Sequence, residues 1–303
     1  MRLQLDPPIL NASGIFSYID VFERLEKMGA AFGGYVTKSI GVNLREGNKN
    51  PIFYEDYNSV GLSNQGLQAW TDEISDSRLK KPLIASIFGF ELGEYETVLG
   101  ALESDVPRKF AAVEYNLSCP NQTPGDKGSL AARFGDSPEL VKEIISTGRK
   151  LTRKPIIAKI SPQCDVKRIA EAAVDAGADY IACSNTWWPM EVKDGKGRTV
   201  LAGKTGGRSG PAVIAGNMIV VGTVYEAVGK SAGIIAYGGI RSAQDIIDYF
   251  KAGASICGIG TVIKDMGDTQ GVVRCTKKIW SETKRYLNKN DTTLEKLRGT
   301  AHV

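Results

Sequence analysis

The chain has 303 residues with ordinary apolar (42%) and charged (24%) content, enough for two average domains or for one large α/β barrel. Its formal net charge of +4 is mild, and no run of lysine and arginine is long enough to indicate a nucleic-acid groove. The five cysteines form no Cys-x-x-Cys pair, so neither a disulfide framework nor a metal site is predicted. The only histidine is His302, which leaves acid–base chemistry to Cys, Lys, Tyr, Asp and Glu.

The amino-terminal stretch MRLQLDPPIL carries no targeting signal. It lacks the apolar core and the cleavage site of a signal peptide, and no window approaches the ~20 apolar residues of a membrane span. We therefore expect a soluble, cytoplasmic protein that has neither a membrane nor a nucleic acid as its partner.

Short apolar runs alternate with helical patterns along the chain. The runs predicted as strands are residues 9–14, 34–39, 83–88, 112–119, 156–161, 180–185, 234–239 and 256–261. Helical periodicity falls at residues 21–28, 67–74, 95–102, 166–174, 218–228 and 272–286, and two more helices are predicted to begin at Ser137 and Ser242. Pro138 and Glu139 follow Ser137, and Asp245 follows Ser242 by three residues, patterns typical of capped helix N-termini.

A Gly-Ala pair recurs where a helix gives way to a strand. It occurs at residues 29–30, 177–178 and 253–254, where glycine supplies the left-handed C-cap that turns the chain back into the sheet. Strict alternation of eight strands and eight helices predicts a single (β/α)8 TIM barrel that spans residues 1–303. An open doubly wound sheet is the alternative.

Loop lengths indicate which end of the barrel is functional. Three strand-to-helix connections, residues 40–63, 120–136 and 186–215, are long and lack periodicity of their own, and all lie on the C-terminal face, where barrel enzymes keep their active sites. The strand ends at this face are polar, although a packed core needs no such groups. They contain Asn11, Ser13, Lys38, Ser39, Asn116, Ser118, Cys119, Ser184, Asn185 and Thr186, and Lys159 lies within an apolar strand.

The last two predicted strands end in glycine. Gly238-Gly239 and Gly258-Ile259-Gly260-Thr261 each precede a helix, where glycine lets backbone N–H groups approach an anion. The loops after strands seven and eight are a recurrent phosphate site in barrels. Together with GGRSG at residues 206–210, these glycines predict a phosphorylated ligand or cofactor.

Ten short motifs resemble class 1 dihydroorotate dehydrogenases, in the family's order and over nearly the whole chain. They are NASG at 11–14, TKS at 37–39, REGN at 45–48, NSVGL at 58–62, NLSCPN at 116–121, AKISP at 158–162, SNT at 184–186, GGRSGP at 206–211, AYGGI at 236–240 and GIGT at 258–261. NLSCPN is the most specific, because its cysteine marks class 1, whereas a serine there marks the membrane-associated class. The resemblance implies an FMN-dependent oxidoreductase that oxidises (S)-dihydroorotate to orotate in pyrimidine (UMP) biosynthesis.

The resemblance also implies which residues form the site. FMN would be held by Ser13, Gly14, Lys38, Ser39, Asn116, Lys159, Ser184, Gly210, Gly238, Gly239, Gly260 and Thr261. The pyrimidine, dihydroorotate or orotate, would be held by Lys38, Asn58, Val60, Gly61, Leu62, Asn116, Asn121, Asn185 and Thr186. Cys119 would be the catalytic base that removes the C5 proton while the C6 hydride passes to flavin N5. No metal is implied.

The chemistry of these side chains suits the implied ligands. The rim of dihydroorotate alternates donors and acceptors, which amide side chains satisfy pairwise, and a lysine can meet its carboxylate. Lys159 beside a reduced flavin would stabilise the negative charge on the ring. A free thiol such as that of Cys119 has a pKa of ~8.5, near enough to neutrality for a usable base. We interpret Cys183, Cys257 and Cys275 as core packing.

Several alternatives stay open on the sequence alone. FMN-dependent tRNA dihydrouridine synthases also carry an Asn-x-x-Cys-Pro run, a non-catalytic phosphate-binding barrel subunit would need the same glycines, and Lys159 would suit the Schiff-base lysine of an aldolase-type barrel. VLAGKTGGRSGPA at residues 200–212 resembles class 1 members that work with an iron–sulfur flavoprotein partner, so we expect that electron-transfer subunit beside a homodimer. Trp187-Trp188 departs from the family pattern after the Asn-Thr pair.

Overall fold

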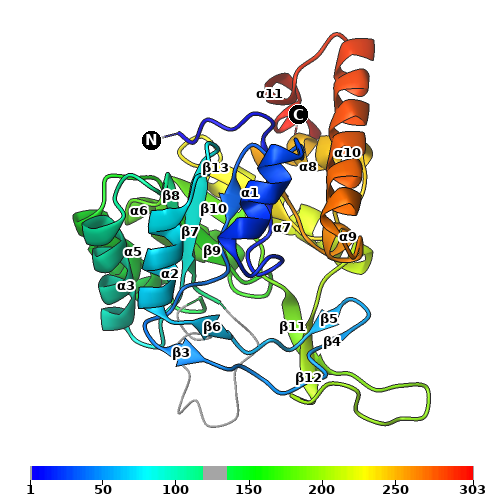
Figure 1. Ribbon diagram of the computed structural model, residues 1–303. Coiled ribbons are helices and arrows are strands. Elements are labelled where there is room, and N and C mark those ends of the chain that lie inside the picture. Colours follow the sequence, from blue (N-terminus) through cyan, green and yellow to red (C-terminus); the bar gives the residue numbers. More distant parts are fainter. Residues whose placement is uncertain (1, 119–134, 303) are drawn as a thin grey trace.

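The computed structural model describes residues 2–118 and 135–302, and its centre is a nearly closed barrel of parallel strands (Figure 1). The strands are β1 (Ile9–Asn11), β2 (Tyr35–Val36), β7 (Leu83–Ile87), β8 (Ala112–Asn116), β9 (Ile156–Ile160), β10 (Tyr180–Cys183), β13 (Gly233–Tyr237) and β14 (Ile256–Ile259). Their order, β1-β14-β13-β10-β9-β8-β7-β2, leaves the first two strands at the ends of the sheet. The predicted (β/α)8 barrel is confirmed, and the open doubly wound sheet is wrong.

A side chain closes the barrel between β1 and β2. The Nδ2 of the fully buried Asn11 donates to the Val36 carbonyl oxygen at 2.8 Å, and the Val36 N–H donates to Asn11 Oδ1 at 2.9 Å. The Gly33 N–H donates to the Ile9 carbonyl oxygen at 2.8 Å. The amide therefore replaces a step of the backbone ladder. The sequence placed Asn11 among the polar groups of a pocket, and this interpretation is wrong.

Alternation along the strands divides the core into an inner and an outer layer. The inner layer contains Leu10, Val36, Ile84, Ala112, Ile157, Tyr180, Ala182, Ile235, Tyr237 and Ile256. The larger outer layer fills the space between the strands and the helices. Because residues two apart share a face of a strand, Ser86, Glu114, Asn116 and Lys159 continue the inner face beyond its apolar part. The barrel interior is thus apolar toward the N-terminal ends of its strands and polar at their C-terminal ends.

Helices surround the sheet (Figure 1). They are α1 (Ile19–Lys27), α2 (Leu67–Asp76), α3 (Leu92–Asp105), α5 (Pro138–Leu151), α6 (Val166–Asp175), α7 (Ile214–Val228), α8 (Ala243–Lys251) and α10 (Thr269–Lys289), with shorter turns η1 (Pro211–Val213), α9 (Thr261–Lys264), α11 (Leu294–Leu297) and η2 (Thr300–His302). The predicted caps are confirmed, because the Ser137 hydroxyl accepts from the Leu140 N–H, and Ser242 and Asp245 form a capping box.

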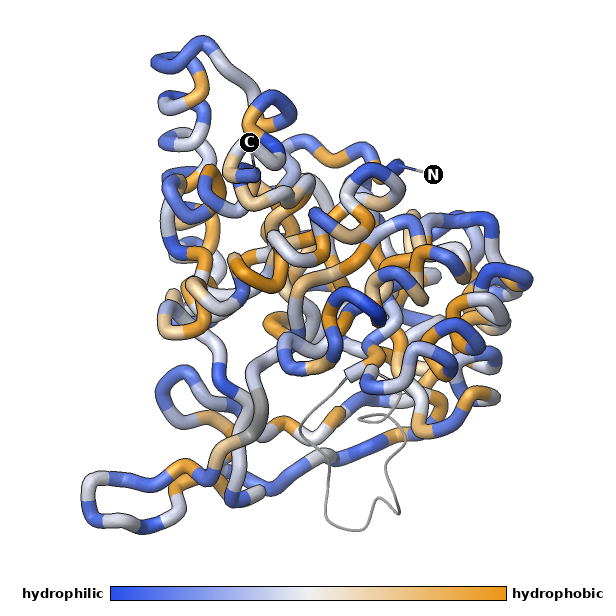
Figure 2. Tube along the Cα trace, turned by 180° about the vertical axis from the view of Figure 1, so that it is seen from behind, coloured by the Kyte–Doolittle hydropathy of each residue, from blue (hydrophilic) through white to orange (hydrophobic). Residues whose placement is uncertain are grey.

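The long loops form antiparallel sheets that the sequence did not reveal. One sheet has the order β11-β12-β5-β4, from β4 (Phe53–Tyr54), β5 (Tyr57–Asn58), β11 (Trp187–Glu191) and β12 (Thr205–Arg208). The other pairs β3 (Leu44–Arg45) with β6 (Asn64–Gln65). These strands lie together below the barrel in Figure 1, and in Figure 2 the apolar segments concentrate in the barrel above them. Most of these strands have only two residues, too few to leave a period in the sequence.

The helical layer contains one notably apolar segment. Among the described residues, Pro211–Val228 is long and apolar enough to cross a membrane by length and composition alone, with a mean hydropathy of 1.4 and 39% of it buried. In the structure, its helix α7 packs against α6, β10 and β13. The segment is therefore a regular part of the barrel wall.

The closure of the barrel by Asn11 can be tested by truncating the side chain. We expect Asn11→Ala to lower the free energy of unfolding by about 2–4 kcal/mol, because the Val36 N–H and carbonyl are left buried without partners. Urea unfolding followed by circular dichroism measures the change. Asn288→Ala, at an exposed position on α10, is the matched control and should change stability by less than about 0.5 kcal/mol. Equal effects of the two substitutions would contradict the closure.

Candidate active site

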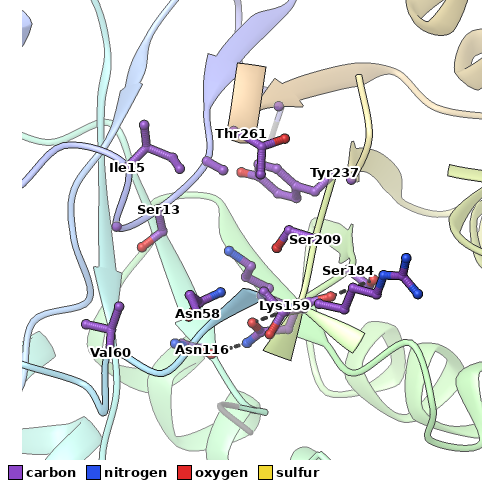
Figure 3. A pocket seen from close by; sticks show the side chains of 18 of the residues that line it. Ser13, Ile15, Asn58, Val60, Asn116, Lys159, Ser184, Ser209, Tyr237 and Thr261 are labelled. Carbon is purple, nitrogen blue, oxygen red and sulfur yellow. Dashed lines mark hydrogen bonds between the residues drawn. The ribbon is translucent and has the colours of Figure 1, made fainter. Parts of the chain in front are cut away.

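A cavity that is open to solvent at its mouth lies at the C-terminal end of the barrel. Strand ends line its floor, and the segments that carry β4, β5, β11 and β12 line its mouth. Figure 3 shows polar side chains from these elements around it, among them Ser13, Asn58, Asn116, Lys159 and Thr261. Its lining extends from the strand ends of the barrel to the loop strands, a breadth that suits a cofactor together with a small substrate.

The structure brings the sequence-predicted site residues together. All of them within the described part of the chain line the cavity: Ser13, Gly14, Lys38, Ser39, Asn58, Val60, Gly61, Leu62, Asn116, Lys159, Ser184, Asn185, Thr186, Gly210, Gly238, Gly239, Gly260 and Thr261. Cys119 and Asn121 lie outside the described residues. What each residue binds stays a prediction.

Sequence reasoning gave no role to several lining residues, namely Ala12, Ile15, Phe53, Ser63, Val213, Asn217 and Tyr237. Arg208, Ser209 and Gly258, which belong to the glycine-rich segments that predicted a phosphate, also line the cavity. For Asn217 there was a signal, since it is the single amide in the apolar stretch IAGNMIVVG of α7. Tyr237 ends an apolar strand and gave none, because a buried tyrosine in a strand usually serves packing.

The cavity floor contains a buried ion pair. Lys159 Nζ lies 3.5 Å from Glu114 Oε1, and their side chains are 8% and 0% exposed. Glu114 also accepts hydrogen bonds from Ser86 Oγ at 3.1 Å and from the Tyr237 hydroxyl at 3.2 Å. Burial, followed by the charge of Glu114, raises the pKa of Tyr237 well above its usual value, so this phenol stays a donor at neutral pH. The floor therefore presents one cation to a ligand, the Lys159 ammonium, whose charge is balanced by the Glu114 carboxylate.

One wall consists of pre-oriented amides and hydroxyls. Asn116 Nδ2 donates to Ser39 Oγ at 3.1 Å, and Asn185 Nδ2 donates to Asn116 Oδ1 at 2.9 Å and to the Ser118 carbonyl at 2.7 Å. The Thr186 hydroxyl, which lines the cavity, is buried without a hydrogen-bond partner among the described residues. An unmet buried hydroxyl costs about 1–3 kcal/mol, so a polar ligand that bonds to Thr186 gains this amount.

Lys38 is a second cation at the cavity. Its Nζ donates to Ser63 Oγ at 2.7 Å, and burial lowers the pKa of Lys38 below the usual value of a lysine. An anion bound beside the amine would raise this pKa again, because an opposite charge favours the protonated form. Lys38 thus favours a ligand that places an anionic group beside it.

Backbone rather than side chains forms the opposite wall, at Gly238, Gly239, Gly260 and Thr261. A Cβ atom at Gly260 would meet nothing closer than Ala12 Cβ at 3.5 Å, so any larger side chain there would occupy the cavity itself. Main-chain N–H groups left uncovered in this way suit a phosphate.

These walls fit FMN together with a small polar substrate. The glycine wall suits the phosphate, Lys159 on the floor suits a ring that gains negative charge on reduction, and the amide wall suits a pyrimidine rim. No cluster of three or more His, Cys, Asp or Glu side chains that could hold a metal ion occurs in residues 2–118 and 135–302. Fold and cavity define a class, the barrel oxidoreductases with a phosphorylated cofactor.

Comparison with known proteins identifies the family within this class. The family model described as dihydroorotate dehydrogenase matches residues 1–282. The chain is 33% identical over 311 residues to the dihydroorotate dehydrogenase B (NAD(+)), catalytic subunit, of Methanocaldococcus jannaschii, covering 99% of this chain and 96% of the relative. It is 36% identical over 269 residues to the protein of the same name from Pelobacter propionicus, covering 86% of this chain and 84% of the relative.

The chain belongs to the dihydroorotate dehydrogenase family. It is therefore an FMN-dependent oxidoreductase of pyrimidine biosynthesis, and the resemblance seen in the sequence motifs to the class 1 enzymes is confirmed. The Schiff-base alternative for Lys159 loses its basis, because this lysine is paired with Glu114 in a flavoprotein family.

The dependence of Lys159 on Glu114 makes a testable prediction. We expect Glu114→Ala to lower the free energy of unfolding by about 3–5 kcal/mol, because it leaves the Lys159 ammonium buried and unpaired. The double variant Glu114→Ala with Lys159→Met should recover part of that loss, since no uncompensated charge remains. Chemical unfolding of the flavin-free forms measures both. A double variant less stable than Glu114→Ala alone would contradict the pairing.

Proposed function

We propose that this chain oxidises (S)-dihydroorotate to orotate in the barrel cavity, with Cys119 as the base that removes the C5 proton. The proposal is supported above all by one observation, that every described candidate residue lines the same cavity. The whole chain, residues 1–303, acts as one catalytic domain. Bound FMN supplies the acceptor for the C6 hydride, and the remaining tasks fall to the side chains of the chain.

Each cavity wall would bind the part of the cofactor or substrate that its chemistry suits. Gly238, Gly239, Gly260 and Thr261 would hold the FMN phosphate, while Ser13, Gly14, Lys38, Ser39, Asn116, Lys159, Ser184 and Gly210 would surround the ring and the ribityl chain. Lys38 would meet the substrate carboxylate. The amides and hydroxyls of Asn58, Asn116, Asn121, Asn185 and Thr186, with the segment Val60, Gly61 and Leu62, would hold the pyrimidine.

The described cysteines are unsuited to act as the base, which supports the assignment to Cys119. Burial raises the pKa of Cys164 to about 12 and raises the pKa values of Cys183, Cys257 and Cys275. These thiols therefore stay protonated at neutral pH, and none of them lines the cavity. In the sequence, Cys119 comes three positions after Asn116, the last residue of β8 and a lining residue of the cavity.

Replacing the thiol tests the role of Cys119. We expect Cys119→Ala to retain its yellow flavin but to slow the bleaching of that flavin by dihydroorotate at least ~100-fold, the usual size of a general-base contribution. Stopped-flow absorbance at the flavin band measures the rate under anaerobic conditions. Cys275→Ala, which removes a half-buried thiol on α10, should bleach at the wild-type rate. Wild-type bleaching by a flavin-loaded Cys119→Ala variant would sink the assignment.

We further propose that the chain is a cytoplasmic homodimer that passes its electrons to an iron–sulfur flavoprotein subunit and from there to NAD. The proposal is supported by the relatives from Methanocaldococcus jannaschii and Pelobacter propionicus, which are named as catalytic subunits of an NAD(+) enzyme. The family match favours this activity over tRNA dihydrouridine synthesis and over a non-catalytic barrel subunit.

The acceptor can be determined on protein purified at its native expression level. We expect an iron–sulfur flavoprotein to co-purify and dihydroorotate to reduce NAD only in its presence, whereas the isolated chain bleaches once and stops. Parallel assays offer fumarate and quinone. Sustained turnover of the isolated chain with fumarate would instead indicate a stand-alone enzyme, and turnover with quinone would indicate a membrane-linked acceptor.

A further inference from the structure

The turn between β13 and α8 has no intrinsic preference for the direction of its peptide groups. Gly238 and Gly239 both lie in the left-handed region, with φ values of +103° and +78°. Glycine rotates freely there, so each peptide group could present either its N–H or its carbonyl to the cavity. A carbonyl oxygen that faces a phosphate would repel it. Something other than the glycines must therefore fix the turn.

The acid of α8 occupies donors at the start of this helix. The Asp245 carboxylate accepts from the Arg241 and Ser242 N–H groups, both at 2.8 Å, and from the Ser242 hydroxyl at 2.9 Å. The sequence predicts a phosphate near this helix N-terminus, and the Asp245 carboxylate already accepts from the Arg241 and Ser242 N–H groups there. The peptide groups of the two glycines, which line the cavity, are therefore the part of the turn whose direction matters most for an anion.

Two buried side chains hold the carbonyl groups of this turn. Asn217 Nδ2 donates to the Tyr237 carbonyl oxygen at 2.9 Å, and the Tyr249 hydroxyl donates to the Gly238 carbonyl oxygen at 2.7 Å. Asn217, on α7, is 1% exposed, and Tyr249, on α8, is 0% exposed. The Asn217 amide packs directly on the turn, because a Cβ atom at Gly238 would lie only 1.9 Å from its Nδ2.

The orientation of the Asn217 amide is itself fixed. Its Oδ1 accepts from the Ser184 hydroxyl at 3.0 Å and from Trp187 Nε1 at 2.9 Å. Because the indole nitrogen of Trp187 can only donate, the amide oxygen must face it and the NH₂ group must face the Tyr237 carbonyl. Trp187, which departs from the family pattern, thereby acquires a role: its indole N–H helps to prevent a flip of the amide.

We infer that Asn217 and Tyr249 are positioning residues that make the cavity selective for a phosphorylated flavin. In a trans peptide the N–H points opposite to the carbonyl. With the Tyr237 and Gly238 carbonyls held by Asn217 and Tyr249, the Gly238 and Gly239 N–H groups are turned toward the cavity that these glycines line. The inference rests on the FMN phosphate site proposed above and extends it to residues outside the glycine motif.

Comparing two flavins separates this role from general packing. Riboflavin has the ring and the ribityl chain of FMN but no phosphate, so its binding affinity does not depend on the orientation of the turn. We expect Tyr249→Phe and Asn217→Ala each to weaken FMN binding about 5-fold or more, the scale of one lost hydrogen bond to a positioned group, and to change riboflavin binding less than about 2-fold. Quenching of flavin fluorescence, titrated with the flavin-free full-length chain, gives both dissociation constants.

The control removes a comparable hydroxyl from the other end of the barrel. Tyr180 is 4% exposed, and its hydroxyl accepts a hydrogen bond from the Leu3 N–H at 2.7 Å. Tyr180→Phe should leave the ratio of the FMN and riboflavin affinities at the wild-type value. Equal weakening of both flavins by Tyr249→Phe and Asn217→Ala, or no weakening of FMN, would overturn the inference.

Two further outcomes bear on the proposed FMN phosphate site itself. Wild-type chain that binds FMN no better than riboflavin would refute the phosphate site and the inference together. Strong wild-type preference for FMN that survives both substitutions would leave the site intact and refute only the positioning role.

Discussion

The buried carboxylate of Glu114 sets the polarity of the barrel's upper end. A charge removed from water is costly unless it is paired and its remaining acceptor sites are filled. Glu114 meets this demand through Lys159, Ser86 and Tyr237, which come from three further strands. The strands β7, β8, β9 and β13 are thereby held together around one side chain, and the Lys159 ammonium is fixed at the floor of the cavity.

The same hydrogen-bond network continues into the cavity wall of amides and hydroxyls. Ser86 Oγ lies 3.1 Å from Ser39 Oγ, which accepts from Asn116, and Asn116 in turn accepts from Asn185. Each group has its partner on a different segment of the chain, so no amide can rotate without breaking a bond to its neighbour. Connected buried polar groups stiffen one another in a low-dielectric interior. The donor and acceptor pattern of this wall is therefore fixed by the barrel before any ligand binds.

Sequence reasoning succeeded where local patterns decide the structure. Alternating apolar runs, helix caps and strand-end polarity are local, and they located the barrel, the cavity and the residues that line it. It failed where a residue's role depends on a distant partner. In the sequence Asn11 is only a polar residue at a strand end, and its role shows only in its hydrogen bonds to Val36. Likewise, Asn217 is an isolated amide in the sequence, and its partners Tyr237 and Trp187 are distant along the chain. Glu114, a charge within the apolar strand AVEYN, led to no prediction, because its partner Lys159 lies on another strand.

The two halves of the cavity differ in how they are built, and this difference suits the reaction. The cofactor half stands on barrel strands with continuous ladders and a closed network. The substrate half also depends on β5 and β12, where Asn58 pairs with Gly207 in strands of two and four residues. Short surface strands with few buried contacts open at lower cost than core strands. Under the proposed function, the substrate that enters and leaves at each turnover would be bordered by the less stable half, and FMN would rest on the stable one.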